Sequence, residues 1–325
     1  MKSVQFEALG LPKDILKVKD VATPEPGPGE VRVKVATCNI NPSDVMFVQG
    51  LYGIRPELPA VGGFEAAGSI DKCGEGVELP VGMRVIFTAI GVWQEYVIVP
   101  AKTIIPTPEG MSDEIACQAF VNPYTAYGML KESGLEAGQW LMLTAGGSAF
   151  GQFVIQLCKQ KGINTLCTVR RDDQVEDLKA LGATVVVNTE AEDLQKAVKE
   201  HTERRGVDYI FDAVGGTLGA KALDCLTQGG TMLVFGLLSL RPIPLNSGIM
   251  IFKDLTVKGF WLTTWMTSLN KEEKIEVTKA VLGMLATEQL KTKIEAKYGL
   301  DEVVKAVEHA DSPGRTGKVI LDLSL

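Results

Sequence analysis

From Glu114 to about residue 263, short apolar runs alternate with longer segments of mixed polarity. Apolar runs of about four to eight residues bounded by turn residues are typical of buried parallel strands. Mixed segments in which apolar residues recur every three or four positions indicate helices. Strands are predicted at 140–144, 163–169, 184–188, 207–213, 231–236 and 255–260, and helices at 150–161, 173–181, 191–203 and 217–227. Six strands that alternate with helices predict an α/β fold with a doubly wound parallel sheet.

The first third of the chain has a different pattern. Short β-like runs such as VRVKVAT and WQEYVIVP are broken by proline and glycine, notably in PEPGPGE at 24–30. After about residue 271, an amphipathic helix is followed by a short helix and an apolar final strand, KVILDLSL, which can return to the first domain. The length of 325 residues also favours two domains. We therefore expect a β-rich domain made of 1–117 and 264–325, and an α/β domain at 118–263.

The stretch from Leu141 to Arg171 carries the most specific motif. It reads as a buried strand, a glycine-rich turn (AGGSAFG), a helix stopped by Gly162, and a second buried strand. This is the first half of a dinucleotide-binding βαβ unit, in which helix N-terminal amides face a pyrophosphate. The strict G-x-G-x-x-G spacing is absent, so a turn that needs small residues only for packing remains the alternative. The predicted pyrophosphate contacts are Gly147, Ser148, Ala149, Phe150 and Gly151.

Two arginines, Arg170 and Arg171, follow the second strand of this unit. An acidic residue at that place holds a ribose hydroxyl of NAD, whereas arginine accommodates the 2′-phosphate of NADP. The sequence therefore predicts NADPH as the cofactor. The alternative is a solvated charge pair beside Asp172 and Asp173, one of which would serve NAD.

Charge and composition narrow the range of partners. The net charge of −7 argues against nucleic acid or an anionic membrane as a partner. No apolar run reaches the length of a membrane span, and the N-terminal MKSVQFEALG lacks the apolar core of a signal peptide. The six cysteines are scattered without a C-x-x-C pair. These features predict a cytoplasmic protein with free thiols.

Histidine is scarce, because only His201 and His309 are present. His201 lies in a charged segment and His309 near a turn, so both are expected at the surface. Acid–base chemistry by histidine, and zinc held by histidine and cysteine, are therefore disfavoured.

The order of a β-rich domain, a dinucleotide domain and a return to the first resembles the medium-chain dehydrogenase/reductase superfamily, over essentially the whole chain. Zinc alcohol dehydrogenases of that superfamily carry a metal cysteine and a metal histidine. Asn41 and Phe64 stand at the matching positions here, and the four-cysteine structural zinc lobe is missing. The resemblance therefore implies the zinc-free branch and excludes a metal cofactor.

Within that branch, the segments at 39–65, 121–130 and 251–265 resemble the 2-enoyl thioester reductases. Members of that family use NADPH to reduce the trans-2 double bond of acyl-CoA or acyl-carrier-protein substrates. Quinone oxidoreductases share several of these elements and remain the alternative, and a non-catalytic NADPH-binding protein is a third reading. Phe64 and Ala149 depart from the reductase pattern, which leaves the acyl substrate open.

The resemblance also implies a catalytic residue. Reduction of an enoyl thioester needs a hydride at Cβ and a proton at Cα, so an acid must lie within hydrogen-bond reach. Tyr52, between Gly50 and Gly53, matches the catalytic tyrosine of the family. The alternative is an aromatic side chain that caps the domain interface.

Further cofactor contacts are implied by position. They are Asn41, Asn122, Phe235, Gly236, Leu237, Leu238, Phe260, Trp261, Leu262, Thr263 and Lys318. Asn41 is expected to order the nicotinamide pocket together with Asp44, and Lys318 resembles a lysine that reaches the cofactor phosphates. Each has a structural alternative: a turn at Asn41 and at Asn122, strand-end packing at 235–238, core or dimer interface at 260–263, and a surface lysine at 318. A homodimer through an edge strand at 249–262 is also expected.

Overall fold

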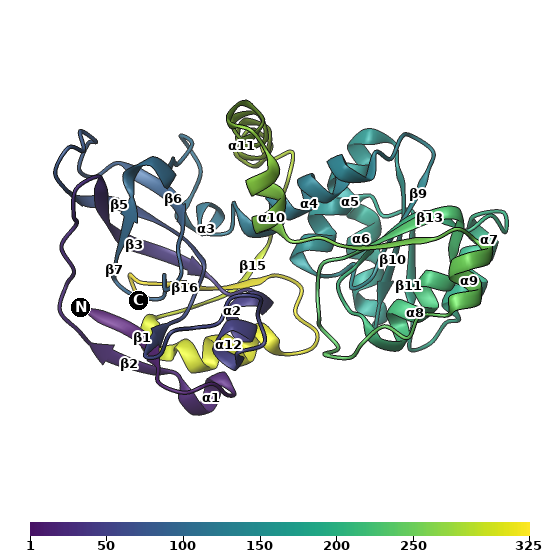
Figure 1. Cartoon of the computed structure of the whole chain (residues 1–325), viewed down its shortest axis with the longest axis horizontal. Coiled ribbons are helices and arrows are strands. Elements are labelled where there is room, and N and C mark those ends of the chain that lie inside the picture. Colours follow the sequence, from purple (N-terminus) through teal and green to yellow (C-terminus); the bar gives the residue numbers. More distant parts are fainter. The chain divides into compact units, whose positions relative to one another are not determined.

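The chain forms two compact units (Figure 1), and each has a cluster of buried hydrophobic residues of its own. The computed structural model describes residues 1–325. Unit 1 comprises Met1–Val121 and Thr292–Leu325, and unit 2 comprises Asn122–Lys291. The first is drawn in purple, blue and yellow in Figure 1, and the second mainly in teal and green.

A six-stranded parallel sheet forms the centre of unit 2, which confirms the predicted fold class. The spatial order is β11-β10-β9-β12-β13-β14. The bounds are Trp140–Leu143 (β9), Asn164–Val169 (β10), Val185–Asn188 (β11), Val207–Asp212 (β12), Leu226–Val234 (β13) and Thr256–Gly259 (β14). All six predicted strands are present, although β13 begins five residues early, at Leu226 rather than 231. The order reverses between β9 and β12, so ligands are expected at the carboxyl ends of these two strands.

The helices of this half begin and end where the local sequence dictates. They are α4 (Val121–Ser133), α5 (Ala149–Lys161), α6 (Val175–Leu181), α7 (Leu194–His201), α8 (Gly216–Asp224), α9 (Ser247–Phe252), α10 (Leu262–Ser268) and α11 (Lys271–Ala286). A 3₁₀ turn, Asp172–Gln174, precedes α6. Helix α7 is shorter than the predicted 191–203, because the Asp193 side chain accepts the Lys196 N–H and fixes the helix start. Helix α5 ends at Gly162, whose φ of 68° is the left-handed conformation that glycine adopts at helix ends.

The return to unit 1 comes later than predicted. The sequence placed it at residue 264, but α10 and α11 belong to unit 2 and the chain returns at Thr292. Trp265 of α10 packs closely over Gly128 of α4, where a Cβ would come within 2.9 Å of the indole ring. Farther along, the Gln156 side chain on α5 bonds both the N–H and the C=O of Lys291, at 2.8 and 2.9 Å. These contacts hold the segment 264–291 on the α/β sheet.

Unit 1 is β-rich. One sheet has the order β15-β16-β3-β5-β6-β8, with β7 also paired to β3, and a smaller sheet has the order β2-β1-β4. The strands are β1 (Lys2–Phe6), β2 (Lys17–Asp20), β3 (Glu30–Asn39), β4 (Ala60–Val61), β5 (Glu65–Cys73), β6 (Arg84–Thr88), β7 (Tyr96–Pro100), β8 (Ile105–Pro106), β15 (Ile294–Tyr298) and β16 (Lys318–Asp322). The helices are α1 (Pro12–Ile15), α2 (Pro42–Gln49), α3 (Asp113–Ala116) and α12 (Val303–Asp311), with 3₁₀ turns at Ala101–Thr103 and Leu300–Glu302.

The final strand does return to the first part of the chain. Strand β16 pairs antiparallel with the end of β3, with Ile320 opposite Asn39 and Leu321 opposite Cys38. This pairing brings Lys318, at the start of β16, to the loop that follows β3. Residues from the two ends of the sequence therefore meet in one place.

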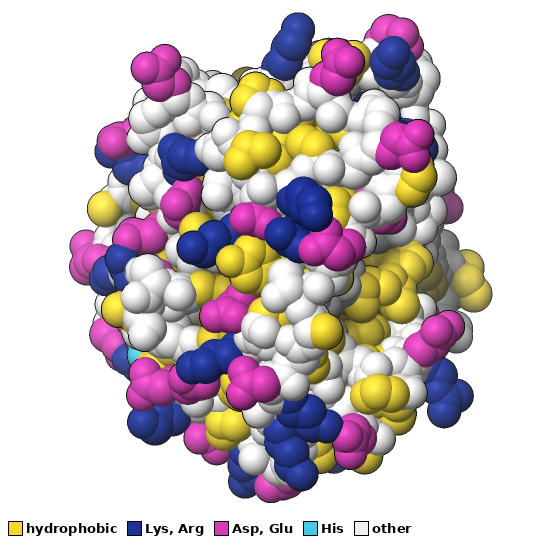
Figure 2. All heavy atoms as spheres, turned by 90° about the vertical axis from the view of Figure 1, so that its left-hand side faces the viewer, with side chains coloured by type: hydrophobic (Ala, Val, Ile, Leu, Met, Phe, Trp, Pro, Cys, Tyr) yellow, Lys and Arg dark blue, Asp and Glu magenta, His cyan; other side chains and the backbone are white.

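All six cysteines are free, and five of them are buried. Burial raises the pKa of the Cys167 thiol to about 12, so it stays protonated and unreactive at neutral pH. No helix is both long enough and apolar enough to cross a membrane. On the face shown in Figure 2, basic and acidic side chains are interspersed, and no basic stripe of the kind that binds a nucleic-acid backbone is visible.

Candidate functional site

The glycine-rich turn joins β9 to α5 in unit 2. Ser148 is the N-cap of α5, and its side chain accepts the Gly151 N–H at 3.1 Å. A Cβ at Gly151 would lie 2.4 Å from the Gly146 carbonyl oxygen, and one at Gly147 would lie 2.6 Å from Gln174 Oε1. The backbone therefore needs glycine at 151, whereas a side chain at 147 would displace the end of the flexible Gln174 side chain, and the turn leaves a cradle at a helix N-terminus. This geometry fits a pyrophosphate, whose oxygens accept hydrogen bonds from N-terminal helix amides.

A buried carboxylate supports this turn from the neighbouring strand. Asp212, at the end of β12, is fully buried and accepts the Thr144 hydroxyl at 2.6 Å. The same hydroxyl accepts the Ala213 N–H, and the second Asp212 oxygen accepts the Gly215 N–H at 2.9 Å. The carboxyl ends of β9 and β12, which flank the point where strand order reverses, are therefore locked together. Neither Thr144 nor Asp212 is among the residues predicted from the sequence, although an acid that ends an apolar strand (YIFD) is a usable signal.

The two arginines lie in different environments. Both follow β10 and are exposed. Arg171 forms an ion pair with Asp173 two residues later, and Asp172 accepts the Asn188 side-chain amide at 2.8 Å. Both aspartates are thus engaged with neighbouring side chains. Arg170 makes no ion pair, so its guanidinium is the one that remains available for a ligand phosphate.

Residues 235–238 follow β13 at the same edge of the sheet. The Phe235 and Phe150 rings pack with centroids 4.1 Å apart, which joins this segment to the first turn of α5. A Cβ at Gly236 would come within 2.5 Å of the Ala213 carbonyl oxygen. Leu237 and Leu238 are 53% and 47% exposed, so ordinary strand-end packing does not explain these two side chains.

The segment 260–263 and Asn122 are also placed at element ends. Phe260 is buried just after β14, whereas Trp261 is 39% exposed. Leu262 and Thr263 begin α10. Asn122 lies in the first turn of α4, so a helix start replaces the simple turn that the alternative reading expected. Contacts of these residues with a cofactor stay predictions.

Unit 1 contains a buried polar network around Lys318. Lys318 Nζ donates to the Asn41 Oδ1 at 2.7 Å and to the Ile40 carbonyl oxygen at 2.8 Å. The Asn41 and Asn39 side-chain amides both donate to Glu65 Oε1 at 2.7 Å. These four side chains are no more than 3% exposed. The alternative of a surface lysine at 318 is therefore wrong. The Lys318 ammonium instead orients the Asn41 side chain.

Glu65 connects this network to the end of unit 1. Its second oxygen, Oε2, accepts the Val121 N–H at 2.8 Å and the Phe120 N–H at 3.3 Å. Glu65 is not among the site residues predicted from the sequence. Its signal was a lone carboxylate in the otherwise apolar run AVGGFEAAG, since a charge in such a run is retained only when it is hydrogen-bonded.

Burial shifts the ionisation of two groups here. It raises the pKa of Asp44 to about 8, even though the Asn41 N–H donates to that carboxylate at 2.6 Å. Burial also lowers the pKa of Lys318 to about 8, although the nearby Glu65 and Asp44 act in the opposite direction. Strongly perturbed groups gathered in one place are typical of functional sites.

Tyr52 lies just beyond helix α2. That helix ends at Gly50, which has a φ of 72° and stands so close to Leu9 that a Cβ would be 2.6 Å away. The Tyr52 ring is half-buried and packs on Phe64, with centroids 5.2 Å apart. A phenol in a loop, neither sealed in the core nor fully exposed, has a suitable position for a proton donor.

The histidines differ from one another. His201 is exposed, as expected. His309 is only 29% exposed, because its Nδ1 lies 3.0 Å from Tyr298 Oη and its Nε2 lies 3.1 Å from Glu295 Oε1. His309 is thus a partly exposed surface residue that is held by two neighbouring side chains of β15.

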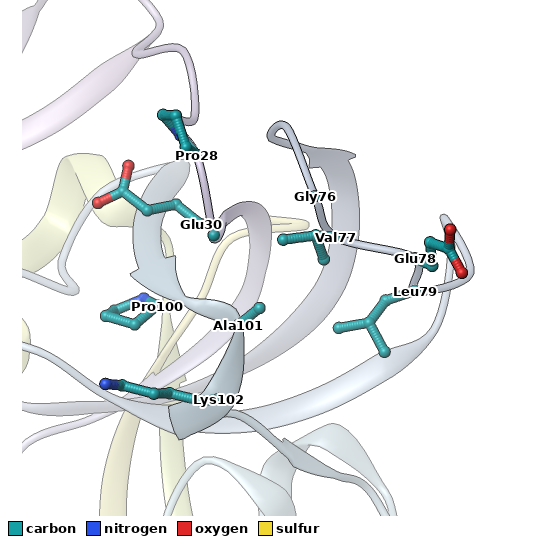
Figure 3. Close-up of a pocket in the computed structure, with 10 residues that line it drawn as sticks. Pro28, Glu30, Gly76, Val77, Glu78, Leu79, Pro100, Ala101 and Lys102 are labelled. Carbon is teal, nitrogen blue, oxygen red and sulfur yellow. The ribbon is translucent and has the colours of Figure 1, made fainter.

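Unit 1 also has an open groove of about 730 Å³ (Figure 3). It is lined by residues around the start of β3, the loop at 76–79 and the end of β7, including Glu30, Leu79 and Lys102. None of the predicted site residues lines it. Neither does any of the buried charged groups, and the groove is therefore not a candidate active site.

Known protein families match both the β-rich part and the α/β part of the chain. The family described as the alcohol dehydrogenase GroES-like domain matches residues 27–109, and the family described as zinc-binding dehydrogenase matches residues 149–282. Mitochondrial enoyl-[acyl-carrier-protein] reductase of Caenorhabditis elegans is 31% identical over 319 residues, covering 95% of this chain and 91% of that protein. The chain belongs to the medium-chain dehydrogenase/reductase superfamily. The protein is thus an oxidoreductase of that superfamily.

Two further relatives of this dehydrogenase/reductase show the range of the family. Mitochondrial enoyl-[acyl-carrier-protein] reductase of Arabidopsis thaliana is 33% identical over 303 residues, covering 90% of this chain and 80% of that protein. The solved structure of Escherichia coli quinone oxidoreductase with NADPH has a TM-score of 0.92 and 27% identity, covering 99% of this chain and all of that one. In this member of the superfamily, no group of three or more His, Cys, Asp or Glu side chains is placed to hold a metal ion.

Proposed function

We propose that the protein is an NADPH-dependent reductase of trans-2-enoyl thioesters. The observation that carries the proposal is Tyr52, a half-buried phenol that matches the catalytic tyrosine implied by the family resemblance, in a chain related over 90% or more of its length to enoyl-[acyl-carrier-protein] reductases. A reductase of this kind belongs to fatty acid metabolism.

The cofactor is NADPH, in agreement with the E. coli relative that was solved with it. Gly147, Ser148 and Gly151 form a cradle that fits its pyrophosphate, together with Ala149 and Phe150 in the same turn. Arg170 accommodates the 2′-phosphate, because its guanidinium is unpaired and always charged. When bound, NADPH supplies the hydride that reduces Cβ of the substrate.

Tyr52 completes the reaction. Addition of hydride at Cβ breaks the Cα=Cβ π bond and leaves an enolate, whose electron pair takes the phenolic proton at Cα. The phenolate is then reprotonated from solvent. Proton transfer from a positioned acid contributes about 10²- to 10⁴-fold to such rates.

The test is NADPH oxidation at 340 nm with trans-2-butenoyl-CoA, in the parent and in Tyr52→Phe. We expect turnover to fall at least ~10²-fold in the variant, while NADPH affinity is nearly kept, because the lost group acts only in proton transfer. Turnover within a few-fold of the parent would remove Tyr52 from the mechanism.

The second candidate is an NADPH:quinone oxidoreductase, favoured by the close structural likeness to E. coli quinone oxidoreductase. A quinone takes hydride on a flat ring and needs no tyrosine acid. Turnover of a benzoquinone that is indifferent to Tyr52→Phe, with none on the enoyl thioester, would select this candidate. Binding of NADPH without turnover on either substrate would indicate a non-catalytic role.

We also propose a homodimer through the edge of the sheet in unit 2. Strand β14 pairs only with β13, which leaves one backbone edge unpaired. Just before β14, Ile251 and Phe252 are 70% and 82% exposed. Contact of such large apolar side chains with water is unfavourable, and an exposed apolar patch beside an unpaired strand edge is typical of an interface. Light scattering should give twice the chain mass, and Phe252→Asp should give the monomer mass. A monomeric parent would contradict this assembly.

The free, mostly buried cysteines suit a reducing compartment such as the cytoplasm.

A further inference from the structure

A row of aromatic rings leads from the core of unit 1 to Tyr52. Phe6 and Phe47 are each 1% exposed, and their ring centroids are 5.9 Å apart. The Phe47 and Phe64 rings follow at 5.1 Å, and the Phe64 and Tyr52 rings at 5.2 Å with planes tilted by 36°. Within this row, Phe64 is the ring that touches Tyr52.

The backbone of Phe64 is tightly fixed. A Cβ at either Gly62 or Gly63 would lie 2.3 Å from the Trp93 ring, so the chain is pressed against a fully buried indole. The Phe64 carbonyl oxygen accepts the Ala89 N–H at 3.1 Å. The next residue, Glu65, is held by the buried network described above.

Tyr52 has a less constrained backbone. It lies in the loop between α2 and β4, which contains no regular secondary structure. A proton donor must nevertheless stay within hydrogen-bond reach of the reacting carbon, and a displacement of about 1 Å can cost about 10²-fold in rate. The Phe64 ring, whose backbone is fixed, supplies one such constraint on Tyr52, since offset and tilted aromatic pairs have preferred geometries.

We propose that Phe64 is a positioning residue, which sets the direction of the Tyr52 phenol through ring packing. The inference rests on the proposed function, because it assigns a partner to the proposed acid.

The experiment is a double-mutant cycle on kcat with trans-2-butenoyl-CoA, using the parent, Phe64→Leu, Tyr52→Phe and the double variant. Phe64→Leu should lower kcat about 10-fold in the parent background. It should change kcat less than about 2-fold when Tyr52 is already phenylalanine, since no phenol remains to be oriented. Phe64→Tyr, which keeps a ring, should retain parent kcat within about 2-fold.

Phe87→Leu is the matched control, because Phe87 is a buried phenylalanine of the same core on β6. It should lower the thermal midpoint without lowering kcat of the folded protein. Equal losses from Phe64→Leu in both backgrounds would overturn the positioning role and leave the acid intact. A parent that does not reduce the enoyl thioester, or a Tyr52→Phe variant with full turnover, would instead overturn the proposed function and this inference with it.

Discussion

Lys318 and Asn41 are 277 residues apart in the sequence and are joined by a 2.7 Å hydrogen bond from Nζ to Oδ1. Because Asn41 also donates to Glu65, its side-chain amide stands between a cation and an anion and has one possible orientation. Asn41 begins α2, the helix that leads to Tyr52. The last strand of the chain thereby orients the residue that caps the start of α2.

Replacing Lys318 with methionine tests this relationship. The Lys318→Met variant keeps most of the apolar stem but leaves two buried acceptors, on Asn41 and Ile40, without this donor. A hydrogen bond to a charged group contributes about 1.5–3 kcal/mol, so the loss of these two bonds should give a clearly lower thermal midpoint. Lys305→Met, at an exposed lysine of α12, is the control and should leave the midpoint nearly unchanged.

The same variant separates the two roles of Lys318. If its ammonium mainly orients Asn41, NADPH affinity should fall little compared with stability. A large loss of NADPH affinity with an unchanged thermal midpoint would instead support the phosphate contact that the family resemblance implies.

Asp44 should make stability depend on pH. Its folded pKa is about 8, above the ordinary value of about 3.9 in an unfolded chain. As pH rises from about 4 to about 8, the unfolded state loses this proton first, so the native state becomes less stable. Above about pH 8 both states are ionised and the effect is complete.

Asp44→Asn should remove that dependence. Between pH 5.5 and pH 8, the thermal midpoint of the parent should fall relative to that of the variant. The variant also loses the interaction with Asn41, and this loss should lower its thermal midpoint by the same amount at every pH. A difference between parent and variant that does not change over this range would show that Asp44 is ionised throughout.

Much of the α/β half could be predicted because strands β9, β10 and β11 are buried on both faces. A parallel strand covered in this way must be an apolar run, as in LMLT and INTLCTV, and glycine at 162 marks the helix end directly. The position of α11 could not be predicted, because an amphipathic helix shows that one face is buried but not which sheet covers it. The Lys318–Asn41–Glu65 network was also out of reach, since it depends on the register of β16 against β3.

Arg170 gives a test of cofactor choice. A hydrogen bond to a charged group contributes about 1.5–3 kcal/mol, so Arg170→Ala should weaken NADPH binding roughly ten- to a hundred-fold. NADH, which lacks the 2′-phosphate, should bind almost as before. Arg171→Ala is the matched control and should have a smaller effect, because Arg171 already pairs with Asp173. Equal weakening of both cofactors by Arg170→Ala would contradict the 2′-phosphate role.

Gly151 should be indispensable to the cofactor turn. Alanine is normally the better helix former by about 0.5–1 kcal/mol, but at Gly151 its Cβ would meet the Gly146 backbone at 2.4 Å. Helix α5 would have to move away from the turn, which separates its N-terminal amides from the pyrophosphate. We expect Gly151→Ala to lower both the thermal midpoint and NADPH affinity, measured by fluorescence titration. Gly283→Ala is the control, because Gly283 lies in α11 with no atom within 4 Å of the added Cβ, and it should raise the midpoint without changing affinity. Parent-like NADPH binding by Gly151→Ala would show that the close approach of α5 is not required for the cofactor.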